Sequence, residues 1–240
     1  IEFRRLRGED ATLGGIARAY RKYQLDRGAC VPLAERAKKN PVLKEAIDAP
    51  EVRIRQAWKP VPSPLPDQTP ENEPKVTPYV TFDRVTDIAR EFKRQGVGKA
   101  EFCLVGWNIG GHDGGEEGLR ACIREVKDLG YLIVPHGNYL DAYRIADSWD
   151  EEWLLKNLDG ITTMHAGDWG GGRGYRICPQ RAYEKFMSRE MPRMKALGFK
   201  GLGYFDVVSV VKARYCGDPR HPLNGEQAAK CAGLPTDGMR

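Results

Sequence analysis

The sequence predicts an α/β fold in which helices alternate with buried parallel strands, as in the first half of an eight-stranded (β/α) barrel. Two observations lead to this prediction. Amphipathic helical patterns end at a glycine, and an apolar strand pattern follows each of them within a few residues. Aromatic and polar residues then gather directly after the strands, where the functional residues of such barrels lie. A complete barrel typically takes about 250 residues, so the four strands expected here amount to half of one.

Each element is expected from its own periodicity. Apolar residues three and four apart predict the helices, and alternation or continuous apolar runs predict the strands. The helices are expected over 9–26, 32–47, 82–95, 116–129 and 180–197, with a short helix over 150–158. The strands are expected over 51–58, 101–107, 131–136 and 202–208, with a minor strand at the segment "GITTM".

The chain is expected to comprise an N-terminal helical segment, residues 1–50, and a partial barrel domain, residues 51–240. The first segment is interrupted at Asn40 and Pro41. Residues 60–78 contain seven prolines, which remove backbone donors, so an extended loop is expected there. The chain begins without a methionine and ends at "PTDGMR", so we expect a piece of a longer polypeptide.

Composition narrows the possible partners. The formal net charge is +5, but the basic residues form no single block, so nucleic acid is not expected as a partner. A run of about 18 apolar residues is missing, so no membrane span is expected and the protein should be soluble, either cytoplasmic or secreted. The six cysteines show no CxxC spacing, which argues against a zinc ribbon or a thioredoxin-like motif. Cys216 and Cys231 lie in loop-like sequence and could pair.

The ends of three successive expected strands carry the most informative residues. They read "GWNIGGHDGG", "PHGNYLDAY" and "GYFDVVS". Aromatic rings offer flat apolar faces, and amides and carboxylates bond to hydroxyl groups, so this mixture suits a carbohydrate ligand. The candidate binding residues are Trp107, Asn108, His112, Asp113, His136, Asn138, Asp141 and Tyr204, with Trp169 of "GDWGGGRG" as a further contact.

Structural roles remain open for several of these residues. Trp107 could be a packing residue, and His136 could be a core histidine bonded to backbone. Asn138 could cap a turn, and Asp113 could cap the following helix. Asp206 is harder to explain in this way, because it lies inside an apolar strand pattern, where a carboxylate without partners is costly.

These motifs, together with "CGDPRHP", resemble bacterial (β/α)₈-barrel glycoside hydrolases, especially the group around the endo-α-N-acetylgalactosaminidases and, more distantly, the α-galactosidase-type retaining enzymes. The resemblance extends from about residue 10 to the end of the chain. It implies a retaining hydrolase that acts on an α-linked sugar without a cofactor or metal. An aspartate at the end of the fourth strand is the nucleophile of that family, which implies this role for Asp206. The acid/base residue of the family lies on a later strand and is therefore expected beyond residue 240.

Two other interpretations of the strand-end residues remain open. A metal-dependent barrel hydrolase or isomerase would use pairs of histidine and aspartate, namely His112 with Asp113, His136 with Asp141, and His165 with Asp168. A non-catalytic carbohydrate-binding barrel would use Asp206 only to bond a hydroxyl group.

Overall fold

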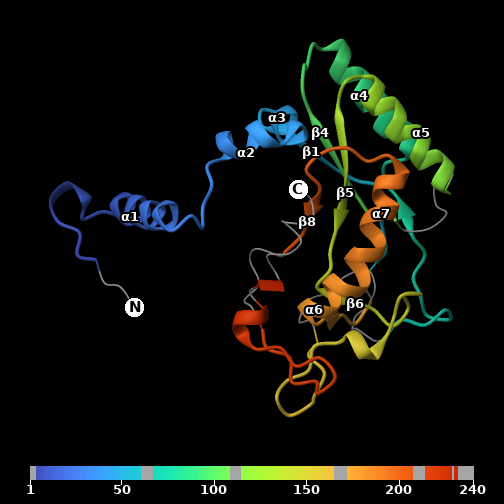
Figure 1. The fold of residues 1–240 in the computed structure, drawn as a ribbon. Coiled ribbons are helices and arrows are strands. Elements are labelled where there is room, and N and C mark those ends of the chain that lie inside the picture. Colours follow the sequence, from blue (N-terminus) through green and yellow to red (C-terminus); the bar gives the residue numbers. More distant parts are fainter. Residues whose placement is uncertain are drawn as a thin grey trace. The chain divides into compact units, whose positions relative to one another are not determined.

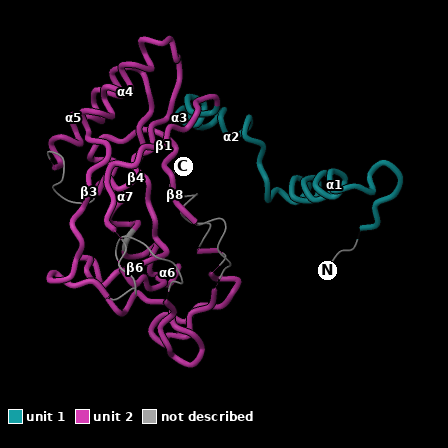
Figure 2. The backbone as a smooth tube through the Cα atoms, turned by 180° about the vertical axis from the view of Figure 1, so that it is seen from behind, with its two compact units in different colours: residues 1–47 teal, residues 48–240 magenta. Residues whose placement is uncertain are grey.

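The structure is a computed structural model that describes residues 4–60, 67–108, 115–164, 172–207, 214–228 and 230–231. The chain divides into two compact units, residues 1–47 and 48–240 (Figure 2). The first unit contains η1 (Gly8–Asp10), α1 (Leu13–Asp26), α2 (Leu33–Lys39) and α3 (Pro41–Ala46). The expected interruption at Asn40 separates α2 from α3. The Asn40 side chain caps α3 by accepting a hydrogen bond from the Leu43 amide.

The second unit is built on a parallel sheet of four strands in the order β1-β4-β5-β8 (Figure 1). These strands are β1 (Glu51–Arg55), β4 (Glu101–Val105), β5 (Leu132–Gly137) and β8 (Tyr204–Phe205). Their sequence order equals their spatial order, as it does in the wall of a (β/α) barrel. The expected fold class, the first half of such a barrel, is confirmed.

Three of the strands are shorter than the sequence predicts, and the smallest difference is at β4, which ends at Val105. After Arg55 the chain leaves the sheet, and β2 (Ala57–Trp58) pairs instead with β3 (Thr77–Pro78) in an antiparallel ladder. The strand expected over 202–208 is confined to β8, because the backbone turns at Asp206 and Val207. Val207 has φ 57°, a left-handed conformation that cannot continue a strand.

The helices that flank the sheet are α4 (Phe82–Arg94), α5 (Gly115–Asp128) and α7 (Ser188–Leu197). The helix expected over 180–197 is broken into α6 (Pro179–Arg181), the π-helical turn η3 (Ala182–Met187) and α7. Pro192 lies inside α7 and lacks the amide hydrogen of a regular helical bond. Gly198 ends α7 with φ 99°, the left-handed conformation that glycine tolerates best.

Smaller elements complete the second unit. β6 (Asp141–Ala142) pairs with β7 (Tyr175–Arg176), and η2 (Glu151–Trp153) stands where a helix over 150–158 was expected. The segment expected as a minor strand makes isolated bridges only, from Thr162 to Lys156 and from Met164 to Tyr175. No helix among the described residues is long and apolar enough to cross a membrane.

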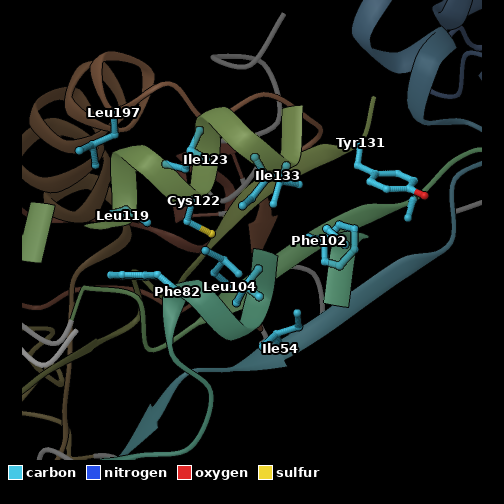
Figure 3. Packing of buried hydrophobic residues seen from close by; sticks show 14 residues of the cluster. Ile54, Phe82, Phe102, Leu104, Leu119, Cys122, Ile123, Tyr131, Ile133 and Leu197 are labelled. Atoms are coloured by element: carbon cyan, nitrogen blue, oxygen red, sulfur yellow. The ribbon is translucent and has the colours of Figure 1, made fainter. Parts of the chain in front are cut away.

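The main hydrophobic core lies between the sheet and its helices (Figure 3). Alternate strand residues point into it, among them Ile54, Phe102 and Ile133. The ring of Phe102 packs 5.6 Å from that of Tyr131, centroid to centroid. Burial of each such side chain contributes about 1.5–3 kcal/mol. Because strand side chains alternate between faces, the intervening residues of β1, β4 and β5 point to the opposite face.

Candidate active site

The candidate site begins with three side chains from different strands. His136 and Tyr204 are opposite each other in the register of β5 and β8, and their rings stack with centroids 5.2 Å apart and an interplanar angle of 20°. The guanidinium carbon of Arg53 lies 4.1 Å from the centre of the Tyr204 ring. Arg53 belongs to β1, at the other edge of the sheet from β8. The two edges therefore curve toward each other, as the wall of a barrel requires.

Asp206 follows β8 directly, and its carboxylate contacts this group. Oδ1 accepts a hydrogen bond from the Val207 amide at 3.0 Å and faces the Tyr204 hydroxyl at 3.4 Å. Oδ2 lies 3.6 Å from Nε2 of His136. The backbone amide of Asp206 donates to the Gly137 carbonyl at 2.8 Å, so the residue is tied to β5 as well.

Asp206 is not buried in an apolar strand, and the prediction from the sequence is wrong on this point. The side chain of Asp206 is 38% exposed, so its carboxylate is not enclosed in an apolar strand. The strand ends before it, and the turn brings the carboxylate to the surface of the strand-end layer. Solvent and hydrogen bonds therefore stabilise the charge of the Asp206 carboxylate, so this charge is not fully desolvated.

The two groups that flank Tyr204, His136 and Arg53, differ in charge at neutral pH. Burial lowers the pKa of His136 below its usual value, although the Asp206 carboxylate partly opposes this effect. The hydrogen bond with Tyr204 raises the pKa of Arg53. At neutral pH a neutral imidazole and a guanidinium cation therefore flank the tyrosine that faces Asp206.

The backbone beside Asp206 is strained. Val207 is the one described non-glycine residue with positive φ. For a β-branched residue this conformation is an outlier, and such residues cluster at functional sites. The strained residue is in direct contact with Asp206, because the Val207 amide donates a hydrogen bond to the Asp206 carboxylate.

A cavity of about 270 Å³ lies beside this group. Five of the residues predicted from the sequence line it: Trp107, Asn108, His136, Asn138 and Asp141. The remaining aromatic and acidic side chains of the lining were not among the predicted site residues: Tyr139, Tyr143, Trp149 and Glu190. Tyr204 and Asp206 are not in the lining, and His136 connects them to the cavity because it contacts both.

Several of the lining side chains are already engaged within the protein. Nε1 of Trp107 donates to the His136 carbonyl at 3.1 Å, so its ring can offer a ligand only its apolar surface. Asn138 donates to Asp141 at 3.1 Å and accepts from the Leu140 amide at 3.0 Å. Asp141 also accepts from Arg176 at 3.1 Å, and its side chain is only 3% exposed. These contacts fix the turn after β5 and shape the cavity wall.

The other sequence predictions fall in different places. His112, Asp113, His165, Asp168 and Trp169 lie outside the described residues. Among the residues that are described, neither His136 nor Asp141 belongs to a group of three potential metal ligands. Arg53 was missed, although the alternation in "EVRIR" already places it opposite the apolar face of β1.

Solved structures show what this arrangement is similar to. The α-N-acetylgalactosaminidase NagBb from Bifidobacterium bifidum, in complex with Gal-NHAc-DNJ, is 25% identical over 92% of this chain and 37% of its own, with a TM-score of 0.79. Its ligand-free structure is 25% identical over 94% of this chain and 40% of its own, with a TM-score of 0.78. The complex with GalNAc gives 24% identity over 91% and 37%, with a TM-score of 0.78.

No protein-family model matches the sequence, and a search of curated proteins found no match. The structural comparison therefore stands alone, and the chain spans about two fifths of the length of the enzyme it matches. The resemblance to barrel glycosidases expected from the strand-end motifs is confirmed by these structures: this chain has the fold of part of a glycoside hydrolase barrel.

Proposed function

We propose that this chain carries the nucleophile side of a retaining α-glycosidase site, with Asp206 as the nucleophile. The observation that carries the proposal is the Asp206 carboxylate, which is partly exposed and hydrogen-bonded at the end of the fourth parallel strand. The similarity to an α-N-acetylgalactosaminidase at 25% identity supports an α-linked sugar as the substrate.

In the first step, a carboxylate oxygen of Asp206 forms a bond to the anomeric carbon while the bond to the leaving oxygen breaks. A general acid protonates that oxygen. In the second step water hydrolyses the glycosyl-enzyme, and the residue that was the general acid now acts as the base. The Val207 amide and the Tyr204 hydroxyl hold Oδ1, which leaves Oδ2, beside His136, as the attacking oxygen.

The second carboxyl group should lie about 5–5.5 Å from the first. We propose that it comes from sequence after residue 240, because the four strands correspond to only part of the matched barrel enzyme.

The remaining side chains are proposed to bind the sugar. Trp107 presents its ring to the cavity, and His136 lies between the cavity and the nucleophile. The other proposed contacts are Asn108, His112, Asp113, Asn138, Asp141, Trp169 and Tyr204. Asn138 and Asp141 act mainly by shaping the cavity wall, since their polar atoms already bond to each other.

The test uses the longest natural form of the protein and aryl α-glycosides, beginning with the α-N-acetylgalactosaminide. Asp206→Ala should lower kcat by several orders of magnitude, because no covalent intermediate can form. Azide should restore turnover in this variant and give a glycosyl azide of inverted configuration. Asp128→Asn, which changes an exposed carboxylate at the end of α5, is the matched control and should keep normal turnover.

A 5-fluoro glycoside, which keeps the 2-acetamido group and traps the intermediate, provides a second measurement. The label should be found on the peptide that contains Asp206. A label on another carboxylate, or wild-type turnover in Asp206→Ala, would show that the assignment is wrong.

A non-catalytic carbohydrate-binding barrel is the second candidate. It is favoured by one observation, namely that the aromatic-lined cavity does not include Asp206 in its lining. Sugar binding without any trapped intermediate, and equal affinity in Asp206→Asn, would select this alternative.

A further inference from the structure

Away from the candidate active site, three potential metal ligands meet in the interior. Cys178 precedes α6, and Cys216 and His221 come from the segment 214–223. All three residues are buried, and their sulfur and nitrogen atoms lie within 4.8 Å of one another. Sγ of Cys216 is 3.4 Å from Nδ1 of His221.

We propose that Cys178, Cys216 and His221 bind a zinc ion that holds these segments together. Zinc bonds are about 2.3 Å to sulfur and 2.0–2.1 Å to nitrogen, so tetrahedral ligand atoms lie about 3.6 Å apart. The observed sulfur-to-nitrogen distance is close to this value, so the ligands need little rearrangement. Thiolates and imidazole favour zinc over magnesium or calcium, which prefer oxygen ligands.

The surroundings of His221 fit a ligand that binds through Nδ1. Its Nε2 atom is buried without a hydrogen-bond partner among the described residues and lies 3.6 Å from Oδ2 of Asp218. A carboxylate behind the second ring nitrogen is the usual way in which a metal-bound histidine is oriented. Asp218 is itself held by Lys156 and Arg220, both with nitrogen atoms 2.8 Å from Oδ2.

The backbone around the three ligands is tightly organised. Cys216 and Leu223 exchange backbone hydrogen bonds of 2.8 and 3.1 Å, which close the loop that carries His221. The Gly217 amide donates to the Lys156 carbonyl, and the Cys178 amide donates to the Trp153 carbonyl, both at 2.8 Å. The ligands are therefore positioned by the backbone before any ion binds.

The site adjoins the candidate active site without sharing its residues. Ile177, which lines the cavity, directly precedes Cys178. A metal bound at Cys178 would fix this part of the cavity wall.

Cys216 and His221 are 3% and 2% exposed, so a thiol–imidazole pair that attacks a substrate is not a reasonable alternative. Two thiolates and a neutral imidazole would neutralise a divalent ion, and Cys231, which packs against the same cluster, or water can complete four-coordination.

The experiment measures metal directly on the intact protein. Metal-depleted protein is titrated with Zn²⁺ and, separately, with Co²⁺. We expect one zinc per chain and, with cobalt, the absorption of a tetrahedral ion together with a thiolate-to-cobalt charge-transfer band. An octahedral cobalt spectrum, or no binding, would overturn the proposal without the need for any variant.

Substitutions then identify the ligands. Cys216→Ser and His221→Gln should each weaken zinc binding by at least about 10–100-fold, the loss that removal of an orienting group alone can cause. His221→Cys should retain binding, since it supplies another thiolate. Cys103→Ala replaces a buried cysteine of β4 and is the matched control, with unchanged zinc content.

The main competing chemistry is a disulfide between Cys178 and Cys216. All six cysteines are free thiols in the structure, so denatured protein prepared without reductant should titrate as six thiols. If only four thiols titrate, and one disulfide joins the peptides that contain Cys178 and Cys216, the proposal is overturned. The readout is metal content and not hydrolysis, so this test is independent of the proposed glycosidase function.

Discussion

Gly201 should be essential for the placement of β8, and Gly201→Ala tests this. Its φ of +155° lies in a range that residues with side chains rarely adopt. A Cβ atom there would lie 2.2 Å from Cγ1 of Val134 and 2.5 Å from Oε2 of Glu101. Val134 is 1% and Glu101 7% exposed, so neither side chain can move into solvent without disturbing the core.

The magnitude follows from two contributions. Overpacking of a buried position typically costs about 1–3 kcal/mol. Displacement of Glu101 would also break its 2.8 Å hydrogen bond from the Leu202 amide, and an unsatisfied buried group costs about 1–3 kcal/mol. We therefore expect Gly201→Ala to lower the free energy of unfolding by about 2–6 kcal/mol. This is a large part of the stability of a typical domain, about 5–15 kcal/mol.

The assay is urea denaturation followed by circular dichroism, with Gly98→Ala as the matched control. A Cβ atom at Gly98 meets no atom within 4 Å, and its φ is not positive. The control should change the free energy of unfolding by less than about 0.5 kcal/mol. If the two alanine variants were equally stable, the tight contact between Gly201, Val134 and Glu101 would not exist in solution.

Two further predictions concern the candidate active site and the proposed metal site. Because burial lowers the pKa of His136, the unfolded state binds more protons, and stability should fall as pH decreases through about 6.5. His136→Gln should reduce this loss between pH 7.5 and 5.5 in urea denaturation, and an unchanged slope would refute the reasoning. At Gly217, a Cβ atom would lie 2.3 Å from the backbone oxygen of Asn157, so Gly217→Ala should displace the loop that carries Cys216 and His221. Zinc affinity should fall in Gly217→Ala but not in Gly225→Ala, where a Cβ atom meets nothing within 4 Å; equal affinities would argue against this loop as the site.

The fold was predictable because its signals are local and repeated. The apolar spacing of Leu119, Cys122 and Val126 defines α5, and Gly130 follows with φ 93°. The alternation at Val52 and Ile54 defines the face of β1 that packs on the core. Each helix–glycine–strand unit carries its own evidence, so parallel pairing follows without any knowledge of distant contacts.

Strand ends and the broken helix were less predictable because they depend on tertiary contacts. The sequence "GYFDVVS" reads as one strand, yet the turn at Val207 stops β8 after Phe205. The apolar pattern alone does not show that pairing with β5 stops once the Asp206 amide has bonded to the Gly137 carbonyl. This difference also explains why Asp206 is more exposed than a strand residue would be.

The candidate site was predicted in part, for a similar reason. Residues at the ends of β4 and β5, such as Trp107 and His136, were identified because a parallel sheet brings strand ends together. Trp149 directly precedes the short helix expected over 150–158, but only a 3₁₀ turn forms there and Trp149 lines the cavity. Glu190 reaches the cavity from α7, and no pattern near it in the sequence indicates this.

The two proposed sites are linked by the order of the chain. Asp206 and Cys216 are ten positions apart in the sequence, and Cys216 is anchored at once by its backbone bonds to Leu223. The connection that leaves the proposed nucleophile therefore enters the proposed metal loop at a fixed point. Cys178 provides a second link, because the residue before it lines the cavity. Zinc removal should therefore disturb both the cavity wall at Ile177 and the segment at Cys216, which follows Asp206 in the chain. The substitution Asp206→Asn should leave the zinc content unchanged. This asymmetry follows because the metal ligands position the active-site segments, while the Asp206 carboxylate contacts none of the ligands in the described structure.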